Sequence, residues 1–199
     1  MDMDIQYYFT PVSPWTYLGH ARFCAIAKAA GARVEVLPVD YGVIFPQSGG
    51  LPLSKRAPQR QAYRLVELKR FSEWLQVPLV LQPKFFPVDG GPASRLLVAT
   101  QRAAGAQAAL ALAGAMMKAV WAEERNLAER ETLAALLSEC TLAAALLSDA
   151  DAPEAAAGYE ANTQRALAAG VFGAPSYVLE GEIFWGQDRL DFLERRLNA

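Results

Sequence analysis

Hydrophobic and polar positions divide the first part of the chain into three clear segments. Ile5 to Phe9 is a short apolar and aromatic run, typical of a buried strand. Apolar and small residues then continue from Ser13 to Ala30, and Gly31 supplies a helix stop. A β-branched run from Val34 to Val39 follows. Strand, helix and strand predict a βαβ unit with two parallel strands.

The middle of the chain is predicted to be mainly helical. From Tyr41 to Pro58, glycine, proline and serine interrupt the pattern, so we expect a long loop. Helical spacing resumes from Gln59 to Leu75, and the prolines of residues 77–88 predict irregular structure. Alanine and leucine at helical spacing from Ala93 to Ala169 predict four or five helices. Breaks are expected at Gly105, residues 125–127, residues 149–153 and Gly170.

Strand patterns return near the end of the chain. Ser176 to Leu179 and Ile183 to Trp185 flank Glu180-Gly181-Glu182, which predicts a tight hairpin. An amphipathic helix is expected from Asp188 to Leu197. The order βαβ, helices, ββα predicts an α/β thioredoxin-like fold with an inserted all-helical domain. Residues 1–44 and 171–199 would form the discontinuous thioredoxin-like domain, and residues 45–170 the insertion.

Composition narrows the class of protein. Charged residues make up 20% of the 199 positions and the net charge is −2, so we expect no nucleic-acid partner. The longest strongly apolar run, residues 108–117, is well short of the roughly 20 residues that span a bilayer. The acidic start has no basic region followed by a separate apolar segment. These features predict a cytoplasmic protein with no membrane partner.

The cysteines and the single histidine do not mark a site. Cys24 and Cys140 are far apart in the chain, so we expect packed thiols rather than a structural disulfide. His20 is expected to be a partly solvated helix residue. With no cluster of ligand side chains in the sequence, no metal site is predicted.

The junction between the first strand and the first helix is the strongest chemical signal. Ser13 followed by Pro14 is a preferred pair for the N-cap and first position of a helix. Free N–H groups and the helix dipole favour an anion there. In thioredoxin-like redox proteins a Cys-x-x-Cys motif begins at this place, but here the residues are Ser13-Pro14-Trp15-Thr16. A thiolate bound here must therefore come from a ligand; alternatively, Ser13 is only an N-cap.

Two groups of motifs resemble a known family. Residues 13–18, Ser-Pro-Trp-Thr-Tyr-Leu, resemble the SPxxYL start of the 2-hydroxychromene-2-carboxylate isomerases and their relatives, the kappa-class glutathione transferases. Ala161-Asn162-Thr163, residues 170–176 (GVFGAPS) and residues 184–190 (FWGQDRL) are similar to the C-terminal signature of the same family. The resemblance covers the chain from end to end.

The resemblance implies glutathione as cofactor. Ser13 would hydrogen-bond the glutathione sulfur and, at a helix N-terminus, favour the thiolate. Pro175 would be a cis-proline that turns the Ala174 backbone toward the tripeptide, which then pairs like an added strand. The segment Trp185-Gly186-Gln187-Asp188 would receive the γ-glutamyl end. Asp188 would take its ammonium, and Gln187 with helix amides its carboxylate; a plain N-terminal dipole role for Asp188 is the alternative.

The activity implied is cis–trans isomerisation of a small aromatic carboxylate in aromatic-hydrocarbon catabolism, by a homodimer. Glutathione thiolate would add to a conjugated carbon, the former double bond would rotate, and elimination would follow. Substrate-pocket residues are expected to be Pro14, Trp15, Phe45, Gly50 and Phe85; packing in the core is the alternative for Phe85 and Phe86.

The chain departs from the family on the substrate side. The family's loop lysine and asparagine are missing between residues 41 and 54, with Gly50 near the asparagine position. Lys55 or Arg56 are candidates to replace the charge, and Thr10 stands where an aspartate is common. A kappa-like glutathione transferase or peroxidase, and a non-catalytic thioredoxin-like binding protein, therefore stay open as alternatives. A dithiol oxidoreductase is disfavoured because the chain has no Cys-x-x-Cys.

Overall fold

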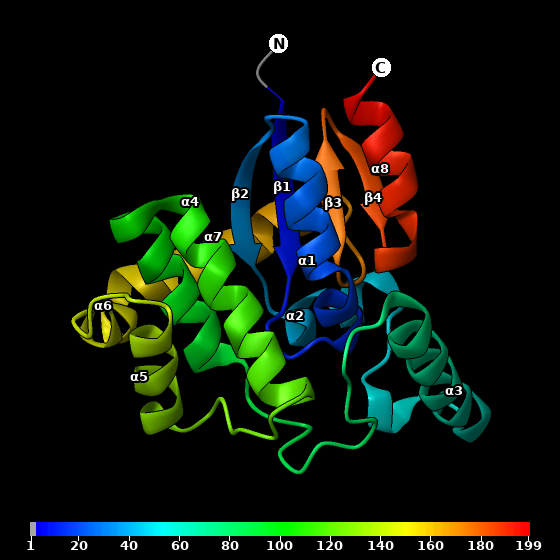
Figure 1. Cartoon of the computed structure of the whole chain (residues 1–199), viewed down its shortest axis with the longest axis horizontal. Helices are drawn as coiled ribbons and strands as arrows, with labels where there is room; N and C mark the ends of the chain where they lie inside the picture. The colour runs from blue at the N-terminus through cyan, green and yellow to red at the C-terminus, as the bar shows by residue number, and fades with distance from the viewer. Residues whose placement is uncertain (1–2) are drawn as a thin grey trace.

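The computed structural model describes residues 3–199, and its centre is a mixed sheet of strand order β2-β1-β3-β4 (Figure 1). The strands are β1 (Asp4–Phe9), β2 (Arg33–Pro38), β3 (Ser176–Leu179) and β4 (Glu182–Trp185). β1 is parallel to β2 and antiparallel to β3, and β3 pairs with β4 as a hairpin. The predicted βαβ unit, the C-terminal hairpin and the thioredoxin-like α/β class are confirmed.

β1 is apolar throughout its second half because helices cover both faces of the sheet. Tyr7 and Phe9 are fully buried on the face that packs against α1 (Pro14–Ala29). Tyr8 points the other way and is buried with residues of α7 (Pro153–Ala168). Alternating side chains of one strand thus enter two separate cores, and the prediction of a buried strand is confirmed.

A short helix, α2 (Tyr41–Ser48), occupies part of the segment that was expected to be a loop, so that prediction was wrong. Asp40 caps it, since its Oδ1 accepts a hydrogen bond of 2.7 Å from the Gly42 N–H. Gly49 ends it in the left-handed conformation, φ 75°. Tyr41 and Ile44 are buried in the core that contains Tyr8. Tertiary burial stabilises this helix, although its glycine and proline content predicts a loop from the sequence.

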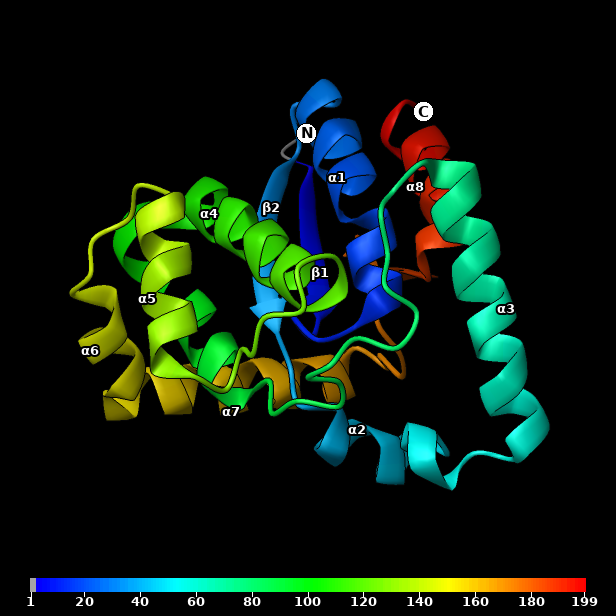
Figure 2. The same cartoon turned by 60° about the horizontal axis from the view of Figure 1, so that its bottom comes forward.

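The next part of the chain contains α3 and α4. α3 (Pro58–Leu75) lies apart from the sheet (Figure 2), and α4 (Gly91–Trp121) packs on β2 and α1. Residues 77–90 contain no helix or strand, as expected. The break predicted at Gly105 is a kink within α4, where φ is 85°. The remaining helices are α5 (Arg130–Glu139), α6 (Leu146–Asp151) and α8 (Leu190–Leu197), with short 3₁₀ turns at Leu53–Lys55 and Gln187–Arg189.

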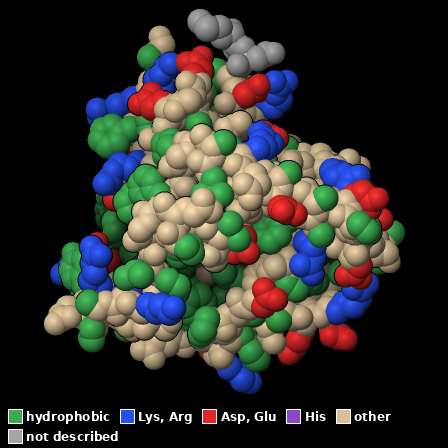
Figure 3. Space-filling model, turned by 180° about the vertical axis from the view of Figure 1, so that it is seen from behind, with side chains coloured by type: hydrophobic (Ala, Val, Ile, Leu, Met, Phe, Trp, Pro, Cys, Tyr) green, Lys and Arg blue, Asp and Glu red, His purple; other side chains and the backbone are tan. Residues whose placement is uncertain are grey.

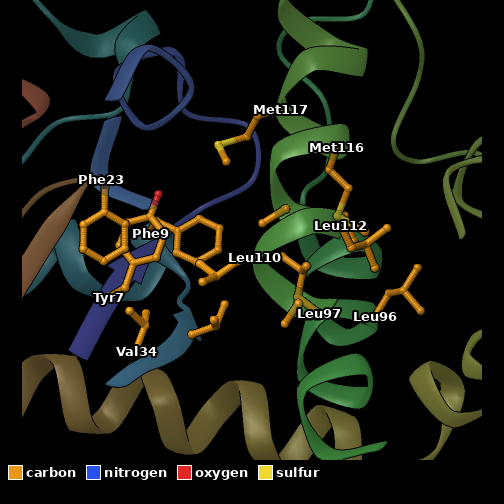
Figure 4. Close-up of a cluster of buried hydrophobic side chains, with 14 of the residues drawn as sticks. Tyr7, Phe9, Phe23, Val34, Leu96, Leu97, Leu110, Leu112, Met116 and Met117 are labelled. Carbon is orange, nitrogen blue, oxygen red and sulfur yellow. The ribbon is translucent and has the colours of Figure 1, made fainter. Parts of the chain in front are cut away.

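Helix α4 joins the core of the sheet to the core of the helical region. Leu110, Met116 and Met117 are buried on it and belong to the same cluster as Tyr7 and Phe9 (Figure 4). By length and composition α4 is long and apolar enough to cross a membrane. Within the described residues 44% of its apolar window is buried inside the protein, many of the buried side chains belong to this core, and the helix is kinked at Gly105.

The Ala-Asn-Thr motif of α7 fastens the end of β2. The Asp40 N–H donates to the Thr163 hydroxyl oxygen over 3.0 Å, and the Asn162 amide Nδ2 donates to the Pro38 carbonyl over 3.4 Å. This motif therefore positions the start of α2. The two-domain division stays a prediction; its boundary at residues 44 and 45 falls within α2.

Candidate functional site

A cavity of about 1500 Å³ opens between the start of α1, the segments α2 and α3, and the loops on either side of the β3–β4 hairpin. Figure 3 shows the molecule from behind, where hydrophobic side chains gather in a recess with Lys and Arg side chains close to it. Most of the predicted site residues line this cavity although they come from distant parts of the chain: Ser13, Pro14, Trp15, Phe45, Gly50, Ala174, Trp185, Gly186, Gln187 and Asp188.

Ser13 lies at the N-terminus of α1 and is 8% exposed. Its backbone is extended (φ −81°, ψ 123°), and its Oγ accepts a hydrogen bond of 3.2 Å from the Thr16 N–H. This bond uses one lone pair and leaves the hydroxyl hydrogen to be donated elsewhere. The N-cap expectation is therefore confirmed. The same hydroxyl has a proton to offer to an anion at the helix N-terminus.

The loop before β3 presents free backbone groups to the cavity. The Ala174–Pro175 peptide is cis, and Pro175 is buried beneath the loop. The Gly173 carbonyl is held by the Tyr41 hydroxyl at 2.8 Å and the Ser176 hydroxyl at 2.7 Å. Within residues 3–199, neither the N–H nor the carbonyl of Ala174 has a hydrogen-bond partner. An extended peptide can pair with both groups.

The segment after β4 closes the same side of the cavity. The Gly186 N–H donates to the Pro175 carbonyl over 2.8 Å, which ties this segment to the cis-proline loop. Gly186 has φ 97°, and a Cβ there would lie 2.5 Å from Asp188 Oδ1, so glycine is required. The Asp188 carboxylate is about half exposed and forms an ion pair with Arg189. An ammonium group of a ligand would have to share or replace that partner.

Gln187 lies beneath the first turns of α1 and is 2% exposed. A Cβ on Gly19 would lie 2.6 Å from Gln187 Cβ, so the glycine allows this close approach. In the described part of the chain, Gln187 Nε2 has no hydrogen-bond partner and is covered by protein. Direct contact of this residue with a ligand would therefore involve its other atoms.

The substrate side of the cavity is aromatic. The Trp15 ring meets Phe71 of α3 edge-on, with centroids 6.0 Å apart. Phe86, and not Phe85, lines the cavity, because neighbouring side chains of this irregular segment point in different directions. Phe86 packs on Trp121 at 4.7 Å, whereas Lys84 Nζ covers the Phe85 ring at 4.9 Å. The pocket role expected of Phe85 is thus corrected in favour of its neighbour.

Phe45 packs closely on the backbone of Gly50. A Cβ on Gly50 would lie 2.4 Å from the Phe45 ring atom Cδ1. Any side chain at this position would require the ring to move, because contacts below 3.0 Å do not occur at a real Cβ. Gly50 and the aromatic side chain at position 45 therefore form one matched arrangement.

Of the two candidate cations, Arg56 lines the cavity, whereas Lys55 does not. Arg60 and Arg64 of α3 line it as well, and the sequence analysis did not select Arg64. The spacing of four residues from Arg60 to Arg64 was the available signal, since such positions share one helical face. Burial and, to a smaller extent, neighbouring Arg56 lower the pKa of Arg64 to about 10, so it stays protonated at neutral pH.

The cysteines and the histidine are outside the site. Burial raises the pKa of the Cys24 thiol to about 11 and also raises that of Cys140, so neither is a thiolate at neutral pH. His20 is 7% exposed, which corrects the expectation of partial solvation. Its burial results from α4, whose Leu110 carbonyl lies 3.0 Å from His20 Nε2. Among residues 3–199 there is no cluster of three or more metal-ligating side chains.

Comparison with known proteins matches nearly the whole chain. Residues 4–198 match the family model of the DSBA-like thioredoxin domain. Three curated relatives share the name 2-hydroxychromene-2-carboxylate isomerase. The one from Pseudomonas putida is 30% identical over 199 residues, with 96% of this chain and 93% of the relative covered.

The chain belongs to the 2-hydroxychromene-2-carboxylate isomerase family, within the DsbA-like proteins. A solved 2-hydroxychromene-2-carboxylate isomerase superimposes with a TM-score of 0.82 at 26% identity, covering 98% of this chain and 95% of the other. The fold is also shared with the cytosolic disulfide reductase DsbM from Pseudomonas aeruginosa, in a structure with GSH. That TM-score is 0.70 at 19% identity, covering 98% of this chain and all of the other. The family resemblance of the motifs is confirmed.

Proposed function

We propose that this family member is a glutathione-dependent cis–trans isomerase of 2-hydroxychromene-2-carboxylate or a related conjugated aromatic acid. The observation that carries the proposal is the Ser13 hydroxyl at the N-terminus of α1, in a cavity where the chain supplies no sulfur. A DsbA-like protein that exchanges disulfides needs a reactive thiolate at this helix start. Here positions 13–16 lack cysteine, and both cysteines have raised pKa values.

The surroundings of Ser13 suit the thiol of glutathione. The free N–H and carbonyl of Ala174 can pair with the tripeptide backbone, and the 185–188 segment lies at the same cavity. The helix N-terminus and the hydroxyl hydrogen both favour a thiolate over a thiol. DsbM, which has the same fold, has a structure with GSH.

In the proposed reaction, the protein's own residues would stabilise a thiolate and hold the substrate. Bound glutathione would supply a thiolate that adds to a conjugated carbon of the substrate while the electron pair moves onto the conjugated carbonyl oxygen. After the former double bond has turned as a single bond, return of the electron pair would expel the thiolate, so the product would be an isomer and glutathione would be regenerated. Ser13 stabilises the thiolate before addition and after elimination, while the aromatic walls hold the substrate and limit water.

The first test uses Ser13→Ala, with Ser54→Ala as a control that removes an exposed hydroxyl outside the cavity. A hydrogen bond to a charged group contributes about 1.5–3 kcal/mol, so turnover should fall about 10- to 150-fold. Isomerisation is followed by absorbance, and glutathione affinity by calorimetry, with S-methylglutathione as a ligand that lacks an ionisable thiol. Equal losses of turnover and affinity would show that Ser13 only shapes the helix start. No glutathione binding by the unaltered protein would overturn the proposal.

The altered substrate side supports a second candidate, a kappa-like glutathione transferase. The matched pair Phe45 and Gly50 removes the family's asparagine position, so the substrate need not be the same. Product analysis separates the two activities, because an isomerase regenerates free glutathione and a transferase consumes it. We also propose an aromatic acid as substrate, a homodimer as the assembly and the cytoplasm as the location.

A further inference from the structure

The cavity carries more positive charge than its own carboxylates can neutralise. Four of its acidic side chains are engaged locally. Asp40 and Asp89 accept backbone N–H groups at 2.7 and 2.9 Å, Glu67 pairs with Arg70 at 2.9 Å, and Asp188 pairs with Arg189.

Four further arginines line the cavity wall; of these, Arg56 donates from Nε to the Leu51 carbonyl over 2.8 Å. In the described part of the chain no carboxylate lies within ion-pair distance of them; they are Arg56, Arg60, Arg64 and Arg95. Like charges that face one cavity repel, and an anionic ligand would relieve that repulsion.

Arg64 is the most constrained of these cations. Its Cζ lies 5.5 Å from the Phe86 ring centroid and 5.7 Å from the Trp121 ring centroid. The two rings hold the guanidinium by cation–π attraction and exclude water from one side of it. Trp121 is itself fully buried, so this platform is rigid.

The same platform is joined to the start of α1. The indole Nε1 of Trp121 donates to the Val12 carbonyl over 3.2 Å, and Val12 directly precedes Ser13. Arg64 and Ser13 are thus connected through one buried aromatic side chain, and both line one cavity. A planar acid lying on Phe86 could place a conjugated carbon toward Ser13 while its carboxylate meets the guanidinium.

We propose that the Arg64 guanidinium, seated on Phe86 and Trp121, binds the carboxylate of the aromatic acid substrate, and that Arg56 strengthens the positive charge there. This inference rests on the proposed function only for the identity of the acid. Arg64 acts on binding and position, since its guanidinium offers a planar pair of donors to a carboxylate.

The test compares Arg64→Gln and Arg64→Lys with Lys69→Gln. Lys69 is on the same helix but is exposed and pairs with Glu73 at 3.9 Å, and neither residue lines the cavity, which makes it a matched control. The probes are trans-2-hydroxycinnamate and its methyl ester, and binding is followed by tryptophan fluorescence. Thermal unfolding of each variant checks that it is folded.

We expect Arg64→Gln to weaken binding of the acid about tenfold or more and to leave the ester unchanged. Arg64→Lys should lie in between, because it keeps the charge and loses the paired donors. In turnover assays the KM for the aromatic acid should rise, with the KM for glutathione unchanged. Lys69→Gln should match the unaltered protein in every measurement.

Several results would overturn the inference. These are unchanged acid binding in Arg64→Gln, equal loss of acid and ester, or no binding of the acid by the unaltered protein. A rise in the KM for glutathione alone would assign Arg64 to a carboxylate of glutathione instead. If Arg64 governs acid binding but no isomerisation occurs, the proposed function fails and the inference stands. If isomerisation occurs and Arg64→Gln is normal, only the inference fails.

Discussion

Acidification should destabilise this protein through one buried side chain, His20. Its Nε2 lies 3.0 Å from the Leu110 carbonyl, which can only accept, so Nε2 carries the hydrogen. Nδ1 then accepts from the Tyr7 hydroxyl at 3.1 Å. Both ring nitrogens of the neutral imidazole are satisfied. A second proton would have to bind Nδ1, where the Tyr7 hydroxyl would then have to accept a hydrogen bond instead of donating one.

Burial lowers the pKa of His20 from 6.5 to about 4, although the hydrogen bond to Leu110 opposes the change. Between these two values the unfolded chain binds one more proton than the folded chain. The contribution of neutral His20 to folding stability is therefore fully present above pH 6.5 and is lost as the pH falls toward 4. The difference between the two pKa values corresponds to a loss of about 3 kcal/mol of folding stability in total, and of about 2 kcal/mol between about pH 7.5 and 5. That is a large fraction of the roughly 5–15 kcal/mol that holds a domain folded.

The assay is urea unfolding at pH values from about 7.5 to 5, for the unaltered protein and for His20→Gln. The glutamine variant is less stable throughout but does not titrate in this range. Carboxylates whose pKa is lowered by arginine or lysine partners, such as Glu67 and Glu123, titrate below this window. The free energy of unfolding should therefore fall by about 2 kcal/mol more in the unaltered protein than in the variant. Parallel pH profiles would refute the argument.

Two further substitutions test how the C-terminal segment is held. Gly19→Ala places a Cβ 2.6 Å from Gln187 Cβ, and such overpacking should cost about 1–3 kcal/mol in thermal unfolding and weaken glutathione binding. Full glutathione affinity in a destabilised Gly19→Ala protein would mean that the segment's position does not matter for the ligand. Asp188→Asn removes a half-exposed ion pair with Arg189, so stability should change by less than about 1 kcal/mol. Glutathione affinity, measured by calorimetry, should nevertheless drop; an unchanged value would remove Asp188 from the site.

The sequence by itself determined the features that depend on neighbouring residues. The N-cap at Ser13 follows from a hydroxyl beside a proline, the hairpin from two β-rich runs around Glu180-Gly181-Glu182, and β1 from a short apolar and aromatic run. Motif similarity added the cavity position of Ala174 and residues 185–188, because these segments flank elements whose order along the chain is recognisable.

Only the tertiary structure decided the features that depend on distant partners. α2 forms because Tyr41 and Ile44 are buried against α7 and the sheet, which outweighs its glycine and proline content. His20 is buried because α4 covers it, and periodicity within α1 does not show what will pack on that side.

The Arg64 platform shows the same limit most clearly. It requires α3, residue 86 and the end of α4 to meet beside Val12, and the bond from Trp121 to Val12 spans 109 positions. Local sequence patterns predict helices, strands and helix ends. The charge of a cavity depends instead on side chains from distant parts of the chain, which only folding brings together.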